Sequence, residues 1–285
     1  MDLIDKVKKA ITDSGFPLEM QMAKVLREND WTVALGQRYV DFETGVLREM
    51  DIVAERSIGG IRINLFIECK KSDNKQLVLY APTHDRHPHF WFHPLRYFPR
   101  IFPGKTAKEK RLSSAWAGLP FFDPEVPVSN GIIFTKGDKV EQHNDSFFNT
   151  LNGLIKNSVN TASDGYIQTN FRIMFFHIVI YDGVMYQLSD SEIMPFDLAP
   201  ISYGQYKFDY RFKFPTGASG LASDLVDTAR KFMLYNIIEI MQPAYLQTYL
   251  QAIEKILCGI PKKTYKGWGI TMEDYTEKMM HKQAI

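Results

Sequence analysis

The stretch from Val46 to Lys71 constrains the fold most, because it is typical of two strands joined by a tight turn. The run Leu47 to Ala54 is strand-like, and Gly59-Gly60 before the second run favours a two-residue turn. From residue 61 to 70 the side chains alternate between two faces: Ile61, Ile63, Leu65, Ile67 and Cys69 on one, Arg62, Asn64, Phe66, Glu68 and Lys70 on the other. The first face is predicted to be core and the second to carry the charges.

The turn also predicts which residues lie opposite each other. If Ile58 pairs with Ile61, counting back sets Asp51 opposite Glu68. Such partners have Cβ atoms roughly 4.5–5.5 Å apart, where two carboxylates repel unless a cation lies between them. Magnesium takes oxygen ligands, often only one or two of them protein carboxylates. The pattern therefore predicts a Mg²⁺ (or Mn²⁺) site made by Asp51, Glu68 and the backbone carbonyl of Cys69.

Lys70 leaves the same strand face two residues beyond Glu68, about 6.6 Å along the strand. Its ammonium could orient or help to deprotonate a water molecule, or neutralise a pentavalent phosphate. This is the chemistry of phosphodiester hydrolysis. The structural alternative is an ordinary amphipathic hairpin with an ion pair from Lys70 to Glu49 or Glu68.

Asp51, followed on the next strand by Glu68-Cys69-Lys70, resembles the motif of the PD-(D/E)xK nuclease superfamily, which includes restriction-endonuclease-like and Mrr-like enzymes. The resemblance covers about the first 80 residues and extends more loosely to about residue 181. Met50 stands where the motif that names the family has proline. Members often carry a further acid on the first helix, and Glu19 matches it. Glu19 lies on the apolar stripe of that helix, so we expect it to point inward, toward a metal or Lys70.

The resemblance implies a restriction-endonuclease-like α/β core, with a mixed central sheet flanked by helices. We expect this domain over residues 1–190, with an insertion at about 82–128. Residues 191–285 form a C-terminal α+β extension that either packs on the same core or stands as a separate domain.

The coarse pattern predicts these elements: helices at 3–13, 16–29 and 143–160; strands at 31–40, 46–55, 61–70, 76–81, 130–135, 171–181, 184–189 and 206–214; and a helix at 223–257 interrupted by Pro243. The apolar run Ile173 to Tyr181, followed by Asp182-Gly183, is interpreted as the first strand of a hairpin. His177 within it is expected to be a core residue with a hydrogen-bond partner.

Basic and aromatic residues are interleaved between Pro82 and Arg111, with seven Lys or Arg against two acids. This mixture suits phosphate contacts and base stacking, but it equally suits an insertion fastened to the core by its aromatic residues. The candidate nucleic-acid contacts are Arg86, Arg96, Arg100, Lys108 and Arg111. The histidines of this segment, His84, His87, His89 and His93, have no clustered cysteines or carboxylates beside them, which disfavours zinc.

Composition limits the remaining function classes. A net charge of +1 gives no global sign of nucleic-acid binding, so any attraction must be local. Two cysteines exclude a disulfide framework and a cysteine-based zinc site. Residues 1–15 lack the apolar region of a signal peptide, and no run reaches the roughly 20 apolar residues of a membrane span. We therefore expect a cytoplasmic protein with no membrane partner.

The residues thus predict metal-dependent phosphodiester hydrolysis, and the resemblance implies an endonuclease that acts on DNA, in defence, repair or recombination. One alternative is a non-catalytic nucleic-acid-binding or interaction module that retains the nuclease fold. Another is an RNA-directed nuclease that uses the same residues. The oligomeric state is open, a homodimer included.

Overall fold

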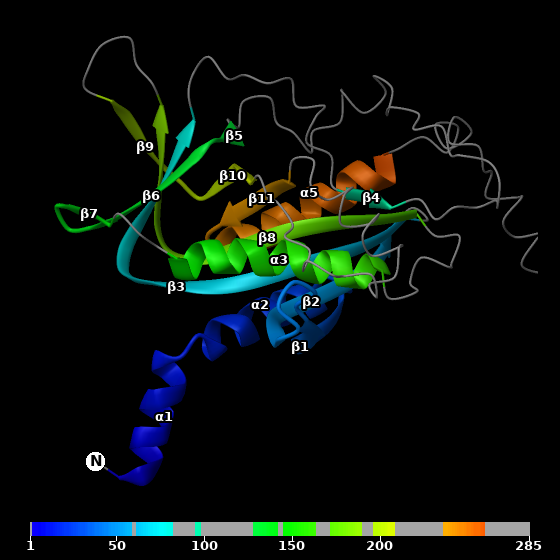
Figure 1. The fold of residues 1–285 in the computed structure, drawn as a ribbon, viewed down its shortest axis with the longest axis horizontal. Helices are drawn as coiled ribbons and strands as arrows, with labels where there is room; N and C mark the ends of the chain where they lie inside the picture. The colour runs from blue at the N-terminus through cyan, green and yellow to red at the C-terminus, as the bar shows by residue number, and fades with distance from the viewer. Residues whose placement is uncertain are drawn as a thin grey trace, which may run out of the picture.

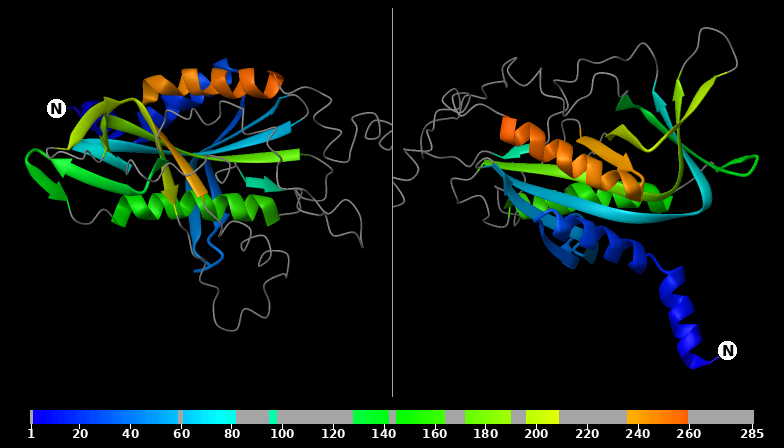
Figure 2. Two further views of the ribbon diagram at one scale, coloured as in Figure 1. Left: turned by 90° about the horizontal axis from the view of Figure 1, so that it is seen from above. Right: turned by 180° about the vertical axis from the view of Figure 1, so that it is seen from behind.

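A mixed β-sheet with helices on both faces forms the body of the protein, seen in a computed structural model (Figure 1). The structure describes residues 2–58, 61–81, 95–97, 128–141, 145–163, 172–189, 196–208 and 236–259. The main path of the sheet has the strand order β1-β2-β3-β8-β11-β10-β5. Figure 2 shows α3 and α5 on opposite faces of this sheet. The predicted class, an α/β protein with a mixed sheet flanked by helices, is confirmed.

Two helices begin the chain, α1 (Leu3–Asp13) and α2 (Phe16–Glu28). Helix α2 buries the stripe that its spacing predicts, with Leu18, Met22 and Leu26 facing the sheet. Helix α1 buries none of its residues and projects away from the body (Figure 1).

Strands β1 (Thr32–Val40), β2 (Leu47–Ile58) and β3 (Ile61–Ala81) follow as an antiparallel set. Ile58 pairs with Ile61, as predicted, while Gly59 and Gly60 lie outside the described residues. Strand β3 covers both strands predicted at 61–70 and 76–81, and its register with β8 shifts between Lys71 and Gln76.

Strand β8 (Arg172–Ser189) is also one long strand, parallel to β3 along its length. The predicted hairpin after Tyr181 is therefore wrong. Gly183 marks a close approach of two strands and not a turn, because a Cβ atom there would lie 2.4 Å from the Cβ of Ser72.

The remaining elements are β4 (Leu95–Tyr97), β5 (Val128–Ser129), β6 (Gly131–Lys136), β7 (Lys139–Glu141), α3 (Asp145–Ser163), β9 (Asp197–Ile201), β10 (Tyr203–Phe208), β11 (Asn236–Met241), the 3₁₀ turn η3 (Pro243–Tyr245) and α5 (Leu246–Gly259). The helix predicted at 223–257 is wrong over 236–241. Strand β11 lies there, parallel to β8 and antiparallel to β10. Its β-branched isoleucines suit a central strand, and the helix begins only after Pro243. Residues 209–214 of the predicted strand and 223–235 of the predicted helix lie outside the described residues.

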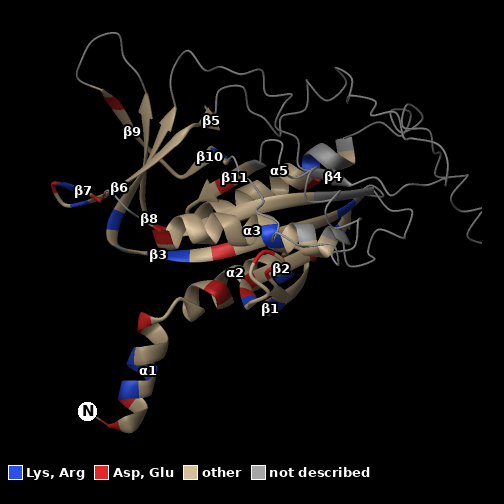
Figure 3. Ribbon diagram, in the orientation of Figure 1, with Lys and Arg blue, Asp and Glu red and all other residues tan. Residues whose placement is uncertain are grey.

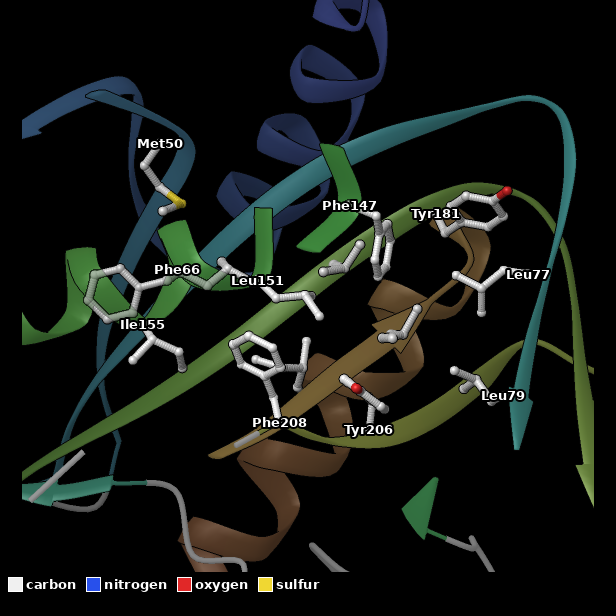
Figure 4. Packing of buried hydrophobic residues seen from close by; sticks show 14 of the residues in the cluster. Met50, Phe66, Leu77, Leu79, Phe147, Leu151, Ile155, Tyr181, Tyr206 and Phe208 are labelled. Carbon is white, nitrogen blue, oxygen red and sulfur yellow. The ribbon is translucent and has the colours of Figure 1, made fainter. Parts of the chain in front are cut away.

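Each face of the sheet has its own hydrophobic core. Under α3, Phe66 and Met50 belong to one core with Leu151, Ile155 and Tyr181 (Figure 4). Under α2 and α5, the core includes Met22, Leu65, Ile178 and Leu250. The second face of residues 61–70 carries Glu68 and Lys70 as expected, but the contrast with a core face is wrong, because α3 covers this face too and buries Phe66 and Asn64.

The strands β10 and β11 of the C-terminal part belong to the same sheet as the N-terminal strands, and α5 packs on the same core as α2. Among the helices that the structure describes, none combines the length and the apolar character needed to cross a membrane.

Candidate functional site

The site begins at a break in the β1–β2 ladder. Leu35 pairs with Ile52 and Gln37 with Met50, so Gly36 lies across from Asp51 at the break. Gly36 has φ 59°, a left-handed conformation that glycine adopts without a Cβ penalty. At this break the side chains of β2 change from one face of the sheet to the other. Ile52 faces the core under α2, whereas Met50 faces the core under α3. Asp51 lies between these two residues, where the strand changes face.

The β2–β3 ladder ends at the same place, with Ile52 paired to Ile67. One further step of this register sets Asp51 opposite Glu68, as the hairpin count predicts. The Asp51 carboxylate instead reaches the next residue, where Oδ2 accepts a hydrogen bond from the backbone N–H of Cys69 at 2.8 Å. In a strand the N–H and C=O of one residue point toward the same neighbour. The Cys69 carbonyl therefore points toward β2 as well.

Glu68 and Lys70 leave the face of β3 that lies toward α3. Their side chains form an ion pair, with 3.2 Å between Lys70 Nζ and Glu68 Oε2. The Lys70 side chain is 31% exposed and the Glu68 side chain is 9% exposed. The pKa of Glu68 is raised to about 7, mainly by burial and then by the charge of Asp51, against the opposing effect of Lys70. Burial outweighs the nearby ammonium because the carboxylate is removed from water on most sides.

Glu19 reaches this group from the first turn of α2, where the positive end of the helix dipole favours an acid. Its side chain is partly buried, and burial, Asp51 and Glu49 raise its pKa, while Lys70 lowers it. Burial also raises the pKa of Asp51, against the Cys69 hydrogen bond and Lys70. The structure thus brings together Glu19, Asp51, Glu68 and Lys70, which lie far apart in the sequence.

Glu49 lies at the rim of the group, on β2 two residues before Asp51. Its carboxylate adds to the negative field at Glu19 and Asp51, and it pairs with Arg38 at 3.8 Å in an exposed position. The ion pair predicted by the structural alternative is present, as Lys70–Glu68 and not as Lys70–Glu49.

A metal centre of three or more His, Cys, Asp or Glu side chains does not occur in the part of the chain that the structure describes. The group at Asp51 offers fewer ligands: the carboxylates of Asp51 and Glu68, whose pKa values are raised, and the Cys69 backbone carbonyl on the side of β3 that faces β2. Magnesium commonly takes one or two carboxylates and fills its other positions with water and phosphate oxygens. The donor set therefore fits such an ion.

The proposed nucleic-acid contacts fall almost entirely outside the described residues. Arg86, Arg100, Lys108 and Arg111 lie there, as do the four histidines of the same segment. The backbone of Arg96 lies in β4, which pairs with β8 at Met174.

Three further buried polar residues are His177, Asp41 and Glu239. His177 lies 2.8 Å from Ser158 Oγ, which confirms the expected core residue with a partner. Sequence reasoning missed Asp41, which is fully buried and bonded to Lys156 at 2.7 Å; the lone lysine on the apolar face of α3 was the available signal. It also missed Glu239, which accepts a hydrogen bond from Tyr203, because a helix was expected there.

Comparison with known proteins adds no relative: no family model, no curated protein and no solved structure matches this chain.

Proposed function

We propose that this chain is a metal-dependent nuclease that hydrolyses DNA phosphodiester bonds at the group formed by Asp51, Glu68 and Lys70. The observation that carries the proposal is the imbalance of charge at this group. Three carboxylates, Glu19, Asp51 and Glu68, have raised pKa values, and Lys70 is the cation that lowers all three. Carboxylates held this way favour binding of a further cation.

Asp51, Glu68 and the Cys69 carbonyl would hold the metal ion, and Glu19 would support it from α2. A bound Mg²⁺ or Mn²⁺ polarises the phosphate and lowers the pKa of a water molecule. The hydrogen bond from Cys69 keeps the Asp51 carboxylate turned toward β3. This restraint pre-orients the acid before substrate arrives.

Lys70 supplies the positive charge next to the reacting phosphate. As the water oxygen bonds to phosphorus, the bond to the leaving sugar oxygen breaks, and negative charge grows on the phosphate oxygens. The ammonium stabilises that charge or orients the water. Its ion pair with Glu68 fixes where it stands.

The direct test is incubation of purified protein with supercoiled, linear and single-stranded DNA and with RNA, with Mg²⁺, Mn²⁺ or a chelator. We expect metal-dependent cleavage of DNA, and loss of cleavage in Asp51→Asn and Lys70→Met. Cleavage of RNA alone would support the RNA-directed alternative.

The exposed pair Lys24–Glu28 on α2 offers matched controls, because it has the same charges outside the site. Lys24→Met and Glu28→Gln should cleave like the original chain. DNA binding without cleavage under every metal condition would favour the non-catalytic module. Equal cleavage by Asp51→Asn would show that the activity resides elsewhere.

A further inference from the structure

The outer half of the β1–β2 hairpin, residues 37–50, extends past the end of the β2–β3 ladder. We call it the hairpin arm. Helix α3 holds the arm, because Lys156 Nζ lies 2.7 Å from Oδ2 of the buried Asp41. The side chain of Asn160, also on α3, donates to the Val40 carbonyl at 2.6 Å. These contacts fix the position of the arm relative to the proposed nuclease centre.

Arg38 lies on this arm beside the centre. It pairs across the hairpin with Glu49, which comes two residues before Asp51 on β2. The Glu49 carboxylate is close enough to raise the pKa of both Glu19 and Asp51, so the Arg38–Glu49 pair borders the group. Figure 3 shows both signs of charge on this hairpin. Two residues of a strand span about 6.6 Å, and a DNA strand carries one phosphate per about 3.4 Å of its axis. A strand whose scissile phosphate lies at Asp51 therefore brings a neighbouring phosphate within reach of Arg38.

The guanidinium of Arg38 is available to a phosphate. Its side chain is 70% exposed, and its Nε lies 3.8 Å from Oε2 of Glu49, whose side chain is 60% exposed. This separation is too long for a hydrogen bond, and an exposed pair of this kind contributes little to stability. Arg48, on the opposite face of the arm, is instead held at 3.0 Å by the buried Asp41, and Lys70 is paired inside the centre. A phosphate can thus bind Arg38 in place of Glu49 with little loss of stability.

The charge of the centre explains why such a cation is needed. The centre has three carboxylates and one ammonium, so it does not attract a phosphodiester strand by itself. A guanidinium binds phosphate oxygens through two parallel hydrogen bonds, which also fixes the orientation of the strand. We propose that Arg38 binds a backbone phosphate of the DNA next to the scissile phosphate, and that Glu49 holds the guanidinium until the substrate binds. This inference rests on the proposed function, because it puts the scissile phosphate at Asp51.

Fluorescence anisotropy with a labelled DNA duplex, in chelator and at several salt concentrations, measures binding without cleavage. We expect Arg38→Gln to weaken binding by about 10-fold and to reduce the salt slope by about one counterion. In the Mg²⁺-dependent cleavage assay the same variant should raise KM and change kcat little, because the lost contact is made equally in the bound substrate and in the transition state. Circular dichroism checks that each variant is folded.

Glu49→Gln should have the opposite effect. It removes the carboxylate that competes with phosphate for Arg38, so DNA should bind more tightly than to the original chain. The gain should be smaller in the double variant with Arg38→Gln, because the guanidinium is then absent. Lys24→Gln and Glu28→Gln are the matched controls, since these residues also form an exposed pair at 3.8 Å, on α2. They report the effect of net charge alone.

Original affinity and salt slope in Arg38→Gln would overturn the inference, and so would an equal loss of affinity in Lys24→Gln. A chain that binds DNA through Arg38 but cleaves none would contradict only the proposed nuclease. A chain that cleaves DNA while Arg38→Gln binds as tightly as the original would contradict only the role of Arg38. A chain that binds no DNA would overturn both.

Discussion

The Asp51 carboxylate accepts the backbone N–H of Cys69 at 2.8 Å, at the point where β2 leaves β3. A side chain thus replaces the strand partner that the ladder no longer provides. The bond ties the acid on one strand to the Glu68-Cys69-Lys70 triplet on the next. The backbone of β3 therefore fixes where the Asp51 carboxylate lies, at the end of the β2–β3 ladder.

Replacing Asp51 should separate this structural role from the chemical one. Asn retains an oxygen that accepts the Cys69 N–H, and it removes a charge that repels Glu68. Ala leaves that partly buried N–H without a partner, which costs about 1–3 kcal/mol. We expect Asp51→Asn to unfold at a higher denaturant concentration than Asp51→Ala, and both to be inactive. Equal stability of the two would show that the hydrogen bond contributes little.

Glu68→Gln should change how stability depends on pH in metal-free protein. The pKa of Glu68 is raised to about 7 in the folded state, so this state holds the proton more tightly than the unfolded chain. Stability contributed by this group therefore falls as pH rises from about 4.5 to 7 and stays low above 7. Gln does not titrate. The free energy of unfolding of the variant, compared with that of the original chain, should therefore be higher at pH 8 than at pH 4 by on the order of 2–3 kcal/mol.

Chemical denaturation at the two pH values measures this difference. The control is Glu28→Gln, on the exposed side of α2, which should leave the pH dependence unchanged. An original chain and a Glu68→Gln variant with parallel pH profiles would contradict the assigned burial of Glu68.

Lys70→Met should abolish cleavage without abolishing metal binding. Lys70 acts on water or phosphate, so saturating Mn²⁺ should not restore the rate. Thermal stabilisation by Mn²⁺ should persist, because the carboxylates that bind the ion remain. Removal of the ammonium should also raise the pKa of Glu68 further. Cleavage at the original rate by this variant would remove Lys70 from the mechanism.

The local sequence pattern predicts the register of β2 and β3, but it does not predict every contact of Asp51. Strand alternation and the turn expected from Gly59-Gly60 predict the pairing of Ile58 with Ile61, which is confirmed, because register is counted from a tight turn. The apolar stripe of α2 predicts that Glu19 points inward. The Asp51–Cys69 bond could not be predicted, since it forms where the β2–β3 ladder ends, and the turn does not determine where that end lies.

The misassigned elements are those whose neighbours come from distant parts of the chain. Asp182-Gly183 looks like a turn, but β3 supplies a long partner along which β8 continues. The short apolar run of β11 does not distinguish a helix from a strand by periodicity alone, and pairing with β8 and β10 makes it a strand. A second buried face under α3 also requires a helix from residues 145–163, which no local pattern in β3 reveals.

Glu239 provides a second titrating group, away from the proposed site. Tyr203 and Gln205 donate to its carboxylate, but burial prevails and raises its pKa to about 7. Its contribution to stability therefore also declines between about pH 4.5 and 7. We expect Glu239→Gln to raise the melting temperature at pH 8 more than at pH 5, with cleavage unchanged. A melting temperature lowered equally at both pH values would contradict this.

Reversing the charges of the basic segment should separate a DNA surface from a structural insertion. If Arg96, Arg100, Lys108 and Arg111 meet phosphates, changing them to Glu should weaken DNA binding and flatten its salt dependence. Each lost contact removes about one counterion from the slope. Side chains that meet phosphates must reach solvent, so under this hypothesis folding should change little, by about 0–1 kcal/mol for each charge. If the affinity for DNA and its dependence on salt concentration are both unchanged, DNA does not bind through these residues and must approach the Glu68 face from another side of the protein.

The most direct test of the proposed centre is the single-turnover rate of Mg²⁺-dependent cleavage of a defined DNA duplex. We expect Glu68→Gln to be slower than the original chain by at least about 10²-fold, with Glu28→Gln unchanged. Glu68→Gln at the original rate, or an original chain that cleaves no DNA with Mg²⁺ or Mn²⁺, would contradict the assignment of Asp51, Glu68 and Lys70 as a nuclease centre.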